Sequence, residues 1–231
     1  MLDTVCFDLG NTLVREKKED RALRAEGARN LYRELALGEK GISFDHFIKV
    51  HDKAWIEAEI SRLKFREVNV VELMKRILEK LGIEYPDISR LIRIYFSPKL
   101  NYVELFPDVL DILRELKKRG YKMVLISNAF PSNKYVFNHF KLYKFFDAAL
   151  FSYEVGLRKP HPDIFYKALD EVGSLPESSI MIGNDPFTDI TGSKVVGMKS
   201  VLIVRRRIDK KRAVVPPDFI IPTLHYILEI L

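Results

Sequence analysis

The 231-residue chain contains no glutamine and a single cysteine, Cys6. One cysteine excludes a disulfide within the chain. Because Cys6 lies in an apolar stretch, we expect a small buried side chain rather than a reactive thiol. Lys and Arg number 38, and Asp and Glu number 32. Abundant charged residues together with scarce glutamine and cysteine are typical of heat-adapted proteins.

Long hydrophobic runs are also missing. No apolar stretch approaches the roughly 20 residues that a membrane-spanning helix needs. The N-terminal sequence MLDTVCFDLGNTL has no basic segment ahead of an apolar one, so we expect no signal peptide and a cytoplasmic protein with no membrane partner. With 47% hydrophobic and 30% charged residues, the composition is that of a globular protein, and the length suits one α/β core with an insertion.

Basic residues gather in one short segment near the C-terminus, in a chain whose formal net charge is +6. A nucleic-acid surface would explain such a cluster, but no nucleic-acid-binding motif accompanies it. We therefore interpret it as a solvated loop after a strand and expect no nucleic-acid partner. The cluster consists of Arg205, Arg206, Arg207, Lys210, Lys211 and Arg212.

Short apolar runs, many of them rich in β-branched or aromatic residues, are predicted to be buried strands. Helical patterns lie between the last four of these runs. Strands that alternate with helices predict an α/β fold with a doubly wound parallel sheet, similar to the Rossmann fold. The predicted strands are residues 4–7, 122–126, 148–151, 180–182 and 200–204, and a helix at 224–231 is expected to cover an edge of their sheet.

The long segment between the first two predicted strands looks helical throughout. Ser43 and Asn69 are candidate N-caps and Gly82 is a candidate C-cap. We predict an α/β core domain of residues 1–15 and 100–231 that carries the chemistry, and an inserted all-helical cap domain of residues 16–99. Helices are expected at 20–37, 44–66, 70–81 and 86–96, with hinges near 14–18 and 99–105.

Polar residues follow four of the predicted strands. The carboxyl ends of parallel strands meet at one edge of an open α/β sheet, which is where such sheets bind their ligands. A carboxylate, a hydroxyl, a cation and a second acidic cluster are therefore expected to lie together. In chain order these residues are Asp8, Ser127, Asn128, Lys159, Asn184, Asp185 and Asp189.

This set of side chains suits phosphoryl transfer. The Asp8 carboxylate can accept a phosphoryl group as an aspartyl phosphate, but the carboxylate and the phosphate repel each other. A divalent ion that bridges Asp8 and the cluster at Asp185 would screen the repulsion, and oxygen ligands favour Mg²⁺. Lys159 would add a fixed positive charge, and the Ser127 hydroxyl could donate to a phosphate oxygen.

The same residues lie in segments that resemble the four motifs of the haloacid dehalogenase superfamily. The resemblance spans both core segments, whereas the inserted segment matches only in its position and helical character. It implies a hydrolase, and a phosphatase above all. The segments are FDLGNTL at 7–13, VLISNA at 124–129, SYEVGLRKPHPDIF at 152–165 and MIGNDPFTDITGSKVVGM at 181–198.

The resemblance implies a role for each matching residue. Asp8 would be the nucleophile, and Lys159 a catalytic cation that also contacts phosphate. Ser127 would bind phosphate, and Asn128 and Thr12 are further candidates for that role. The implied substrate is a small soluble phosphate ester, and the chain could act as a monomer or a homodimer. The implied Mg²⁺ ligands are Asp8, the backbone carbonyl of Gly10, Asn184, Asp185 and Asp189.

Two positions depart from the pattern of the family. Its phosphatases usually carry a second Asp, the general acid and base, two residues after the nucleophile, where this chain has Gly10. Such help is worth roughly 10²–10⁴-fold, so we expect a slower phosphatase, a substitute acid from the cap, or another reaction. In the fourth motif the usual Gly-Asp pair reads Gly183-Asn184. We favour Asp185 as the charged metal ligand, with Asn184 contributing its carbonyl oxygen.

Three functions therefore remain open. A Mg²⁺-dependent phosphatase is the leading hypothesis. Gly10 and the Ser127-Asn128 pair leave room for a 2-haloacid dehalogenase, although the dehalogenases of the family carry Tyr in place of Gly10 and lack this acidic fourth motif. Gly10 and Asn184 would also suit a catalytically impaired binding protein. We interpret Arg158 as a solvated loop residue.

Overall fold

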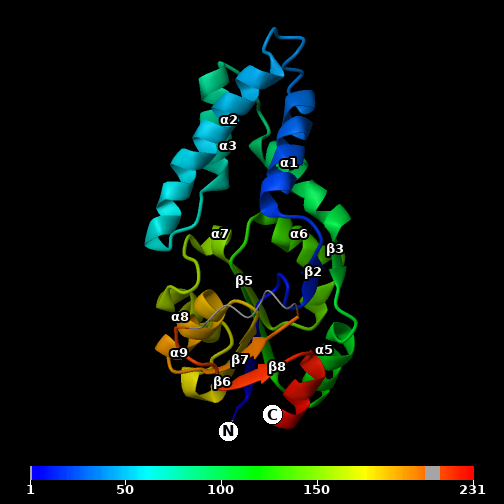
Figure 1. Cartoon of the computed structure of the whole chain (residues 1–231), viewed down its shortest axis with the longest axis vertical. Coiled ribbons are helices and arrows are strands. Elements are labelled where there is room, and N and C mark those ends of the chain that lie inside the picture. The colour runs from blue at the N-terminus through cyan, green and yellow to red at the C-terminus, as the bar shows by residue number, and fades with distance from the viewer. Residues whose placement is uncertain (1, 206–213) are drawn as a thin grey trace.

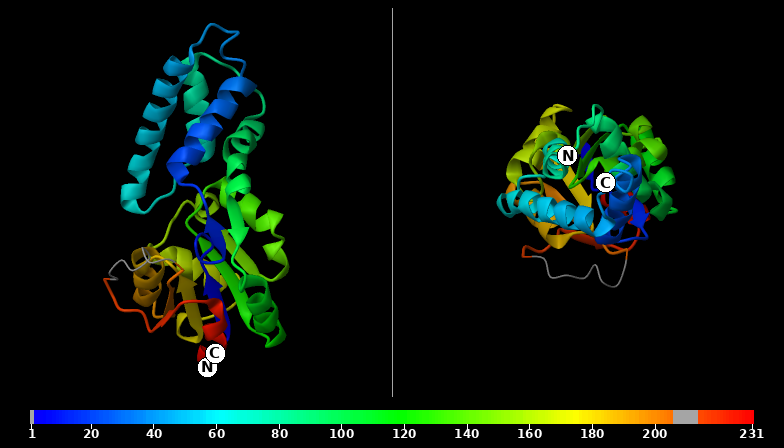
Figure 2. Two further views of the ribbon diagram at one scale, coloured as in Figure 1. Left: turned by 45° about the vertical axis from the view of Figure 1, so that its right-hand side comes forward. Right: turned by 90° about the horizontal axis from the view of Figure 1, so that it is seen from above.

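The computed structural model describes residues 2–205 and 214–231. An α/β unit and a helical unit lie one above the other, and both chain termini lie at the far end of the α/β unit (Figures 1 and 2). No helix in these two ranges combines the length and the apolar character needed to cross a membrane. Of the basic cluster, Arg205 is described, whereas Arg206, Arg207, Lys210, Lys211 and Arg212 lie outside the described residues.

A six-stranded parallel sheet forms the α/β unit and confirms the predicted fold class. The central strand β1 lies between β4 and β6, so the residues that follow these three strands are neighbours at one edge. The sheet order is β5-β4-β1-β6-β7-β8. The strands are β1 (Thr4–Phe7), β4 (Lys122–Ser127), β5 (Ala148–Phe151), β6 (Ser179–Gly183), β7 (Lys199–Ile203) and β8 (Phe219–Ile221).

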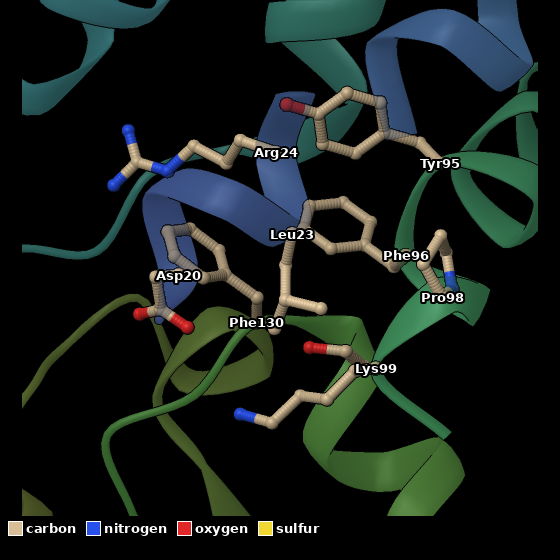
Figure 3. Close-up of a pocket in the computed structure, with 9 residues that line it drawn as sticks. Asp20, Leu23, Arg24, Tyr95, Phe96, Pro98, Lys99 and Phe130 are labelled. Atoms are coloured by element: carbon tan, nitrogen blue, oxygen red, sulfur yellow. The ribbon is translucent and has the colours of Figure 1, made fainter. Parts of the chain in front are cut away.

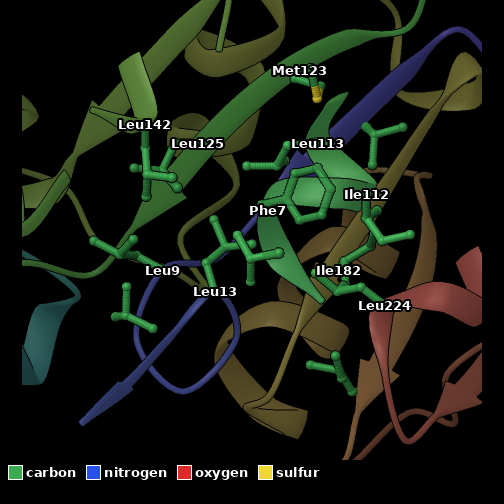
Figure 4. Close-up of a cluster of buried hydrophobic side chains, with 14 of the residues drawn as sticks. Phe7, Leu9, Leu13, Ile112, Leu113, Met123, Leu125, Leu142, Ile182 and Leu224 are labelled. Atoms are coloured by element: carbon green, nitrogen blue, oxygen red, sulfur yellow. The ribbon is translucent and has the colours of Figure 1, made fainter. Parts of the chain in front are cut away.

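Apolar side chains on both faces of the sheet hold the helices of the α/β unit. On one face, Phe7, Leu125 and Ile182 pack against Leu113 of α5 (Val109–Lys118), as Figure 4 shows. On the other face, Cys6 packs in a cluster with residues of α8 (Pro162–Asp170). Burial raises the pKa of the Cys6 thiol to about 12, so the prediction of a buried, unreactive cysteine is confirmed.

The remaining helices of the α/β unit are short. The predicted C-terminal helix is a turn, η7 (Leu224–Tyr226), followed by α10 (Ile227–Ile230). Leu224 and Ile227 pack into the same cluster as α5, and strand β8 occupies the sheet edge, so the prediction of a helix on the edge was wrong. The other α-helices are α6 (Pro131–His139), α7 (Ser152–Val155) and α9 (Gly192–Val195). Two 3₁₀ helices, η3 (Leu142–Lys144) and η4 (Pro176–Ser178), and a π-helix, η5 (Pro186–Thr191), complete the part of the unit that the structure describes.

The helical unit has its own buried core, which includes Phe47, Trp55 and Tyr95. The Ser43 side chain accepts from His46 N at 3.2 Å, and Asn69 caps α3, as predicted. The helices are α1 (Asp20–Glu34), α2 (Phe44–Glu59), α3 (Val70–Leu81) and α4 (Ile88–Phe96), with 3₁₀ turns η1 (Ile60–Lys64) and η2 (Ser97–Tyr102).

The inserted segment is not helical throughout. At its two ends β2 (Val14–Glu16) and β3 (Val103–Leu105) pair antiparallel, with Val14 opposite Leu105. Strands of three residues are too short to give an alternating sequence pattern. They form because the chain leaves and re-enters the α/β unit side by side, and the two predicted hinge segments are therefore joined by backbone hydrogen bonds.

A second connection ties the helical unit to the α/β unit. Arg158 N donates to Phe65 O at 3.0 Å, and Glu67 N donates to Gly156 O at 3.0 Å. These bonds flank a bridge between Arg66 and Leu157. The segment after η1 is thus fixed beside the loop of the third motif.

Candidate active site

A cavity of about 180 Å³ lies where β1, β4 and β6 end, between the α/β unit and the helical unit. Nearly every residue around it is polar or charged, as a site for a charged ligand requires. Its lining consists of Asp8, Gly10, Glu16, Asp20, Arg62, Lys99, Asn128, Phe130, Asn133, Arg158, Asn184, Asp185, Thr188 and Asp189.

An ion triad lies at the floor of this cavity. The Lys159 ammonium donates to Asp8 Oδ1 at 2.9 Å and lies 2.7 Å from Asp189 Oδ1. Lys159 and Asp189 are 1% exposed and Asp8 is 8% exposed. Burial acts against the charge of Lys159, but Asp189 and Asp8 raise its pKa. Burial also raises the pKa of Asp189, although Lys159 opposes that change. The triad therefore places one buried ammonium between two carboxyl groups.

Thr12 and Asn184 lie beside the second oxygen of Asp8. The Thr12 hydroxyl donates to Asp8 Oδ2 at 3.3 Å and lies 3.5 Å from Asn184 Oδ1. Thr12 is fully buried and does not line the cavity itself. Its contacts bring the ends of the first and fourth motifs together.

Asp185 and Asp189 serve the turn that follows β6. Asp185 Oδ1 accepts from Phe187 N at 2.9 Å and Thr188 N at 2.8 Å, and Asp189 Oδ2 accepts from Asp185 N at 3.0 Å. A Cβ at Gly183 would lie only 2.2 Å from Asp189 Oδ2. Glycine at this position therefore allows Asp189 to approach the strand and reach Lys159.

Asn128 holds the backbone of Lys159 from both sides. Its Oδ1 accepts from Lys159 N at 2.7 Å, and its Nδ2 donates to Lys159 O at 2.9 Å. Ser127 is 1% exposed, and its Oγ accepts from Asn133 Nδ2 at 3.4 Å. The predicted residues of the second and third motifs are thus brought together, with Ser127 behind the cavity lining rather than in it.

Glu16 and Lys99 belong to this site, although no motif in the sequence marks them. Lys99 Nζ lies 2.6 Å from Glu16 Oε1 and donates to Asn133 Oδ1 at 2.7 Å. A Cβ at Gly10 would lie 2.9 Å from Glu16 Oε1. The Glu16 carboxylate therefore occupies the space that a side chain at Gly10 would enter.

An apolar recess of about 20 Å³ adjoins the cavity on the side of the helical unit. Figure 3 shows Leu23 of α1, Phe96 of α4 and Phe130 around it. Asp20, Lys99 and Phe130 line both spaces. The recess is small, so the room for a ligand is the polar cavity above Asp8.

The predicted metal ligands all lie around this one cavity. Within residues 2–205 and 214–231, no three His, Cys, Asp or Glu side chains form a metal-binding group. However, Asp8, Gly10, Asn184 and Asp185 all line one cavity, and they offer two carboxylates, an amide oxygen and a backbone carbonyl. An all-oxygen set with few charges fits Mg²⁺, which keeps several of its waters. The fifth candidate, Asp189, is 1% exposed and binds Lys159 and the backbone of Asp185, so it supports the site from behind.

Comparison with known proteins identifies the family. Residues 2–197 match the family described as haloacid dehalogenase-like hydrolase. The chain belongs to this family. The haloacid dehalogenase-like chain is 30% identical over 203 residues to a glyceraldehyde 3-phosphate phosphatase of Pyrococcus furiosus, over 87% of this chain and 80% of that protein. The family resemblance of the motifs is thereby confirmed, and the chain is a hydrolase.

Solved structures of this hydrolase family share the fold. A phosphatase of the family from Thermococcus onnurineus aligns over 99% of this chain and 97% of its own, with a TM-score of 0.67 and 22% identity. A 2-haloacid dehalogenase from Pseudomonas syringae aligns over 100% and 98%, with a TM-score of 0.71 and 23% identity. At such identities the likeness extends to the fold alone, so it does not separate the two reactions.

Proposed function

We propose that the chain is a Mg²⁺-dependent phosphatase that hydrolyses a small soluble phosphate ester through an aspartyl phosphate at Asp8. The carrying observation is the buried triad, in which the Lys159 ammonium lies 2.9 Å from Asp8 Oδ1 at the floor of a polar cavity. Asp8 is 8% exposed, so its carboxylate borders the cavity while its charge is balanced from below. The phosphatase activity named for the Pyrococcus furiosus relative supports this proposal.

The residues around Asp8 would hold it ready for in-line attack on phosphorus. Lys159 would orient Asp8 Oδ1 and offset the negative charge that the phosphate brings. Asn128 would keep Lys159 in place through its two backbone hydrogen bonds, and Asp189 would hold the other side of the ammonium. Ser127, which lies behind the cavity lining, would support the phosphate site by holding Asn133, a residue of that lining, through its hydroxyl.

Asp8, Asp185, Asn184 and the Gly10 carbonyl would hold the Mg²⁺ ion. When bound, the ion would supply positive charge between the nucleophile and the phosphate oxygens. Asp185 uses Oδ1 for the turn after β6, so its Oδ2 would be the oxygen directed to the metal. Asn184 Oδ1 already lies on the side of Asp8 Oδ2.

Glu16 would supply the acid–base chemistry that Gly10 lacks. As an oxygen of Asp8 bonds to phosphorus and the ester P–O bond breaks, the proton held between Lys99 and Glu16 would pass to the leaving oxygen. The Glu16 carboxylate would then take a proton from the water that attacks the phosphorus of the aspartyl phosphate, which restores both residues. Lys99, at 2.6 Å, would hold Glu16 against the turn at Gly10.

Hydrolysis of p-nitrophenyl phosphate tests this proposal, because its acidic leaving group needs little help from a general acid. We expect turnover with Mg²⁺, its loss with EDTA, and its loss in Asp8→Asn. Turnover equal to that of Asp8→Asn, or unaffected by EDTA, would contradict the proposed function.

A further inference from the structure

Two arginines, Arg62 and Arg158, line the upper part of the cavity. Arg62 belongs to η1, and Arg158 precedes the catalytic lysine candidate in the third motif. The backbone bond from Arg158 N to Phe65 O, at 3.0 Å, and the adjacent bridge fix the two segments side by side. The two guanidinium groups are therefore held near each other by the fold.

The carboxylate of Glu67 forms its direct ion pair with Arg62. Arg62 Nε and Nη2 lie 2.8 and 2.7 Å from Glu67 Oε1, and Glu67 Oε2 accepts from Ser152 Oγ at 2.7 Å. Arg62 also lies over the Phe130 ring, at 4.3 Å from its centroid. Glu67 is 7% exposed and both its oxygens have partners, so its charge acts on Arg158 without a direct ion pair.

The charge of Arg158 is offset through space by Glu67 and Glu59 rather than by a direct ion pair. Among the residues that the structure describes, no carboxylate makes an ion pair with Arg158. Glu59, a further acid in its vicinity, lies 2.6 Å from Arg24 Nη2. Burial, and after it the like charge of Arg62, lowers the pKa of Arg158. A partly buried guanidinium beside a second one is a favourable place for an anion, and its planar donors suit carboxylate and phosphate oxygens.

We propose that Arg158, with Arg62 beside it, forms a subsite for a second anionic group of the substrate. The preferred substrates are then phosphate esters that also carry a carboxylate or a second phosphate. This inference rests on the proposed phosphatase function. The transferred phosphoryl group takes the position above Asp8, and the second anion takes the position under the helical unit, so both ends of the substrate are held in one cavity.

Matched pairs of esters test the subsite. The first pair is 3-phosphoglycerate and glycerol 3-phosphate, and the second is the bisphosphate and the monophosphate of 1,3-propanediol. In the wild-type protein we expect kcat/KM to be about tenfold or more higher for the member with two anionic groups in at least one pair, since hydrogen bonds to charged groups are stronger than those between neutral groups. Comparing the two pairs shows whether a carboxylate or a phosphate is the preferred anion.

Substitution of Arg158 should abolish this preference. We expect Arg158→Gln to bring the kcat/KM ratio within each pair close to one, chiefly through KM, and Arg158→Lys to retain part of it. Arg114→Gln is the control, because Arg114 lies on α5 with a side chain that is 61% exposed. Melting temperatures should match that of the wild type, to show that the variants fold.

Two results would overturn the subsite. One is an Asp8-dependent hydrolysis of all four esters with no preference within either pair. The other is an Arg158→Gln variant that loses the same factor on every ester, which would place Arg158 on the transferred phosphoryl group. Calorimetric titration of Asp8→Asn with the same esters measures the preference as a difference in binding affinity, without turnover. Binding with the expected preference but no wild-type hydrolysis would leave the subsite standing and overturn only the proposed function.

Discussion

The role proposed for Glu16 can be tested directly by substitution. Its carboxylate fills the space next to Gly10 and pairs with Lys99, which in turn reaches the second motif through Asn133. Neither residue belongs to a recognisable motif, because each lies in a segment that was predicted to connect the two domains. Only the folded chain brings them to Asp8.

Replacing Glu16 should affect esters according to their leaving groups. We expect Glu16→Gln to lower kcat/KM for glycerol 3-phosphate by roughly 10²–10⁴-fold, because an alkoxide needs a proton as it departs. The loss should be much smaller for p-nitrophenyl phosphate. Glu104→Gln, which changes a 39% exposed carboxylate on the paired strand, is the control. An equal loss on the two esters would argue for a structural role of Glu16.

The fourth motif allows a test of the metal ligands. Asn184 and Asp185 both line the cavity, one with a neutral oxygen and one with a charged one. We expect Asp185→Asn to raise the Mg²⁺ concentration needed for half-maximal activity by at least the roughly 10–100-fold that outer-shell partners are worth. Asn184→Asp should lower it, because it adds a charged ligand. A fall for Asp185→Asn together with a rise for Asn184→Asp would mean that the metal lies elsewhere.

At the scale of elements, Asp108 connects three parts of the α/β unit. It precedes α5 without capping it, and its Oδ2 instead accepts from Arg205 Nη1 and from Leu224 N, both at 2.7 Å. Arg205 also donates to Thr12 O at 3.0 Å. The start of α5, the end of β7 and the C-terminal turn are thereby linked to the first motif.

The Asp108 link should make stability depend on pH. Burial acts against the charge of Asp108, but the bonds from Arg205 and Leu224 N–H lower its pKa below the ordinary 3.8. A lowered carboxyl pKa contributes stability that is present above about pH 3.8 and is lost as the pH falls through the folded-state pKa. Asp108→Asn should cost about 3–5 kcal/mol at pH 7, because it leaves Arg205 buried without its partner.

Denaturant unfolding at pH 7 and at pH 3 measures this effect. The difference in unfolding free energy between the wild type and Asp108→Asn should shrink at the lower pH. Asp111→Asn, on the exposed side of α5, is a suitable control with a side chain that is 74% exposed. A difference that is independent of pH would show that the charge of Asp108 does not contribute.

Some helices and strands could be predicted from the sequence pattern and others could not. Strand β1 and helix α3 have the predicted bounds, because apolar runs and caps such as Asn69 define their ends locally. The strands β2, β3 and β8 were missed, since each has three residues and pairs only with a distant segment. The C-terminal helix was found but misplaced, because nothing in its sequence distinguishes an edge from the face beside α5.

At the scale of the whole molecule, the site joins two kinds of residues. Those that follow the strands, such as Asp8 and Lys159, could be predicted because parallel strands end at a common edge. Those from the inserted segment and its connections, such as Glu16 and Arg62, could not, because their positions depend on how the helical unit lies on the α/β unit. Arg158 was interpreted as a solvated loop residue, whereas the structure places it half-buried in the cavity lining, beside the segment after η1.

Trapping the intermediate tests the central claim most directly. The protein is mixed with p-nitrophenyl phosphate and Mg²⁺, treated with borohydride, which reduces an aspartyl phosphate to homoserine, and digested for mass spectrometry. We predict reduction at Asp8 alone, and none when substrate is omitted or when Asp8→Asn is used. Substrate turnover with no reduction at Asp8, or reduction at another carboxylate, would contradict an aspartyl phosphate at Asp8.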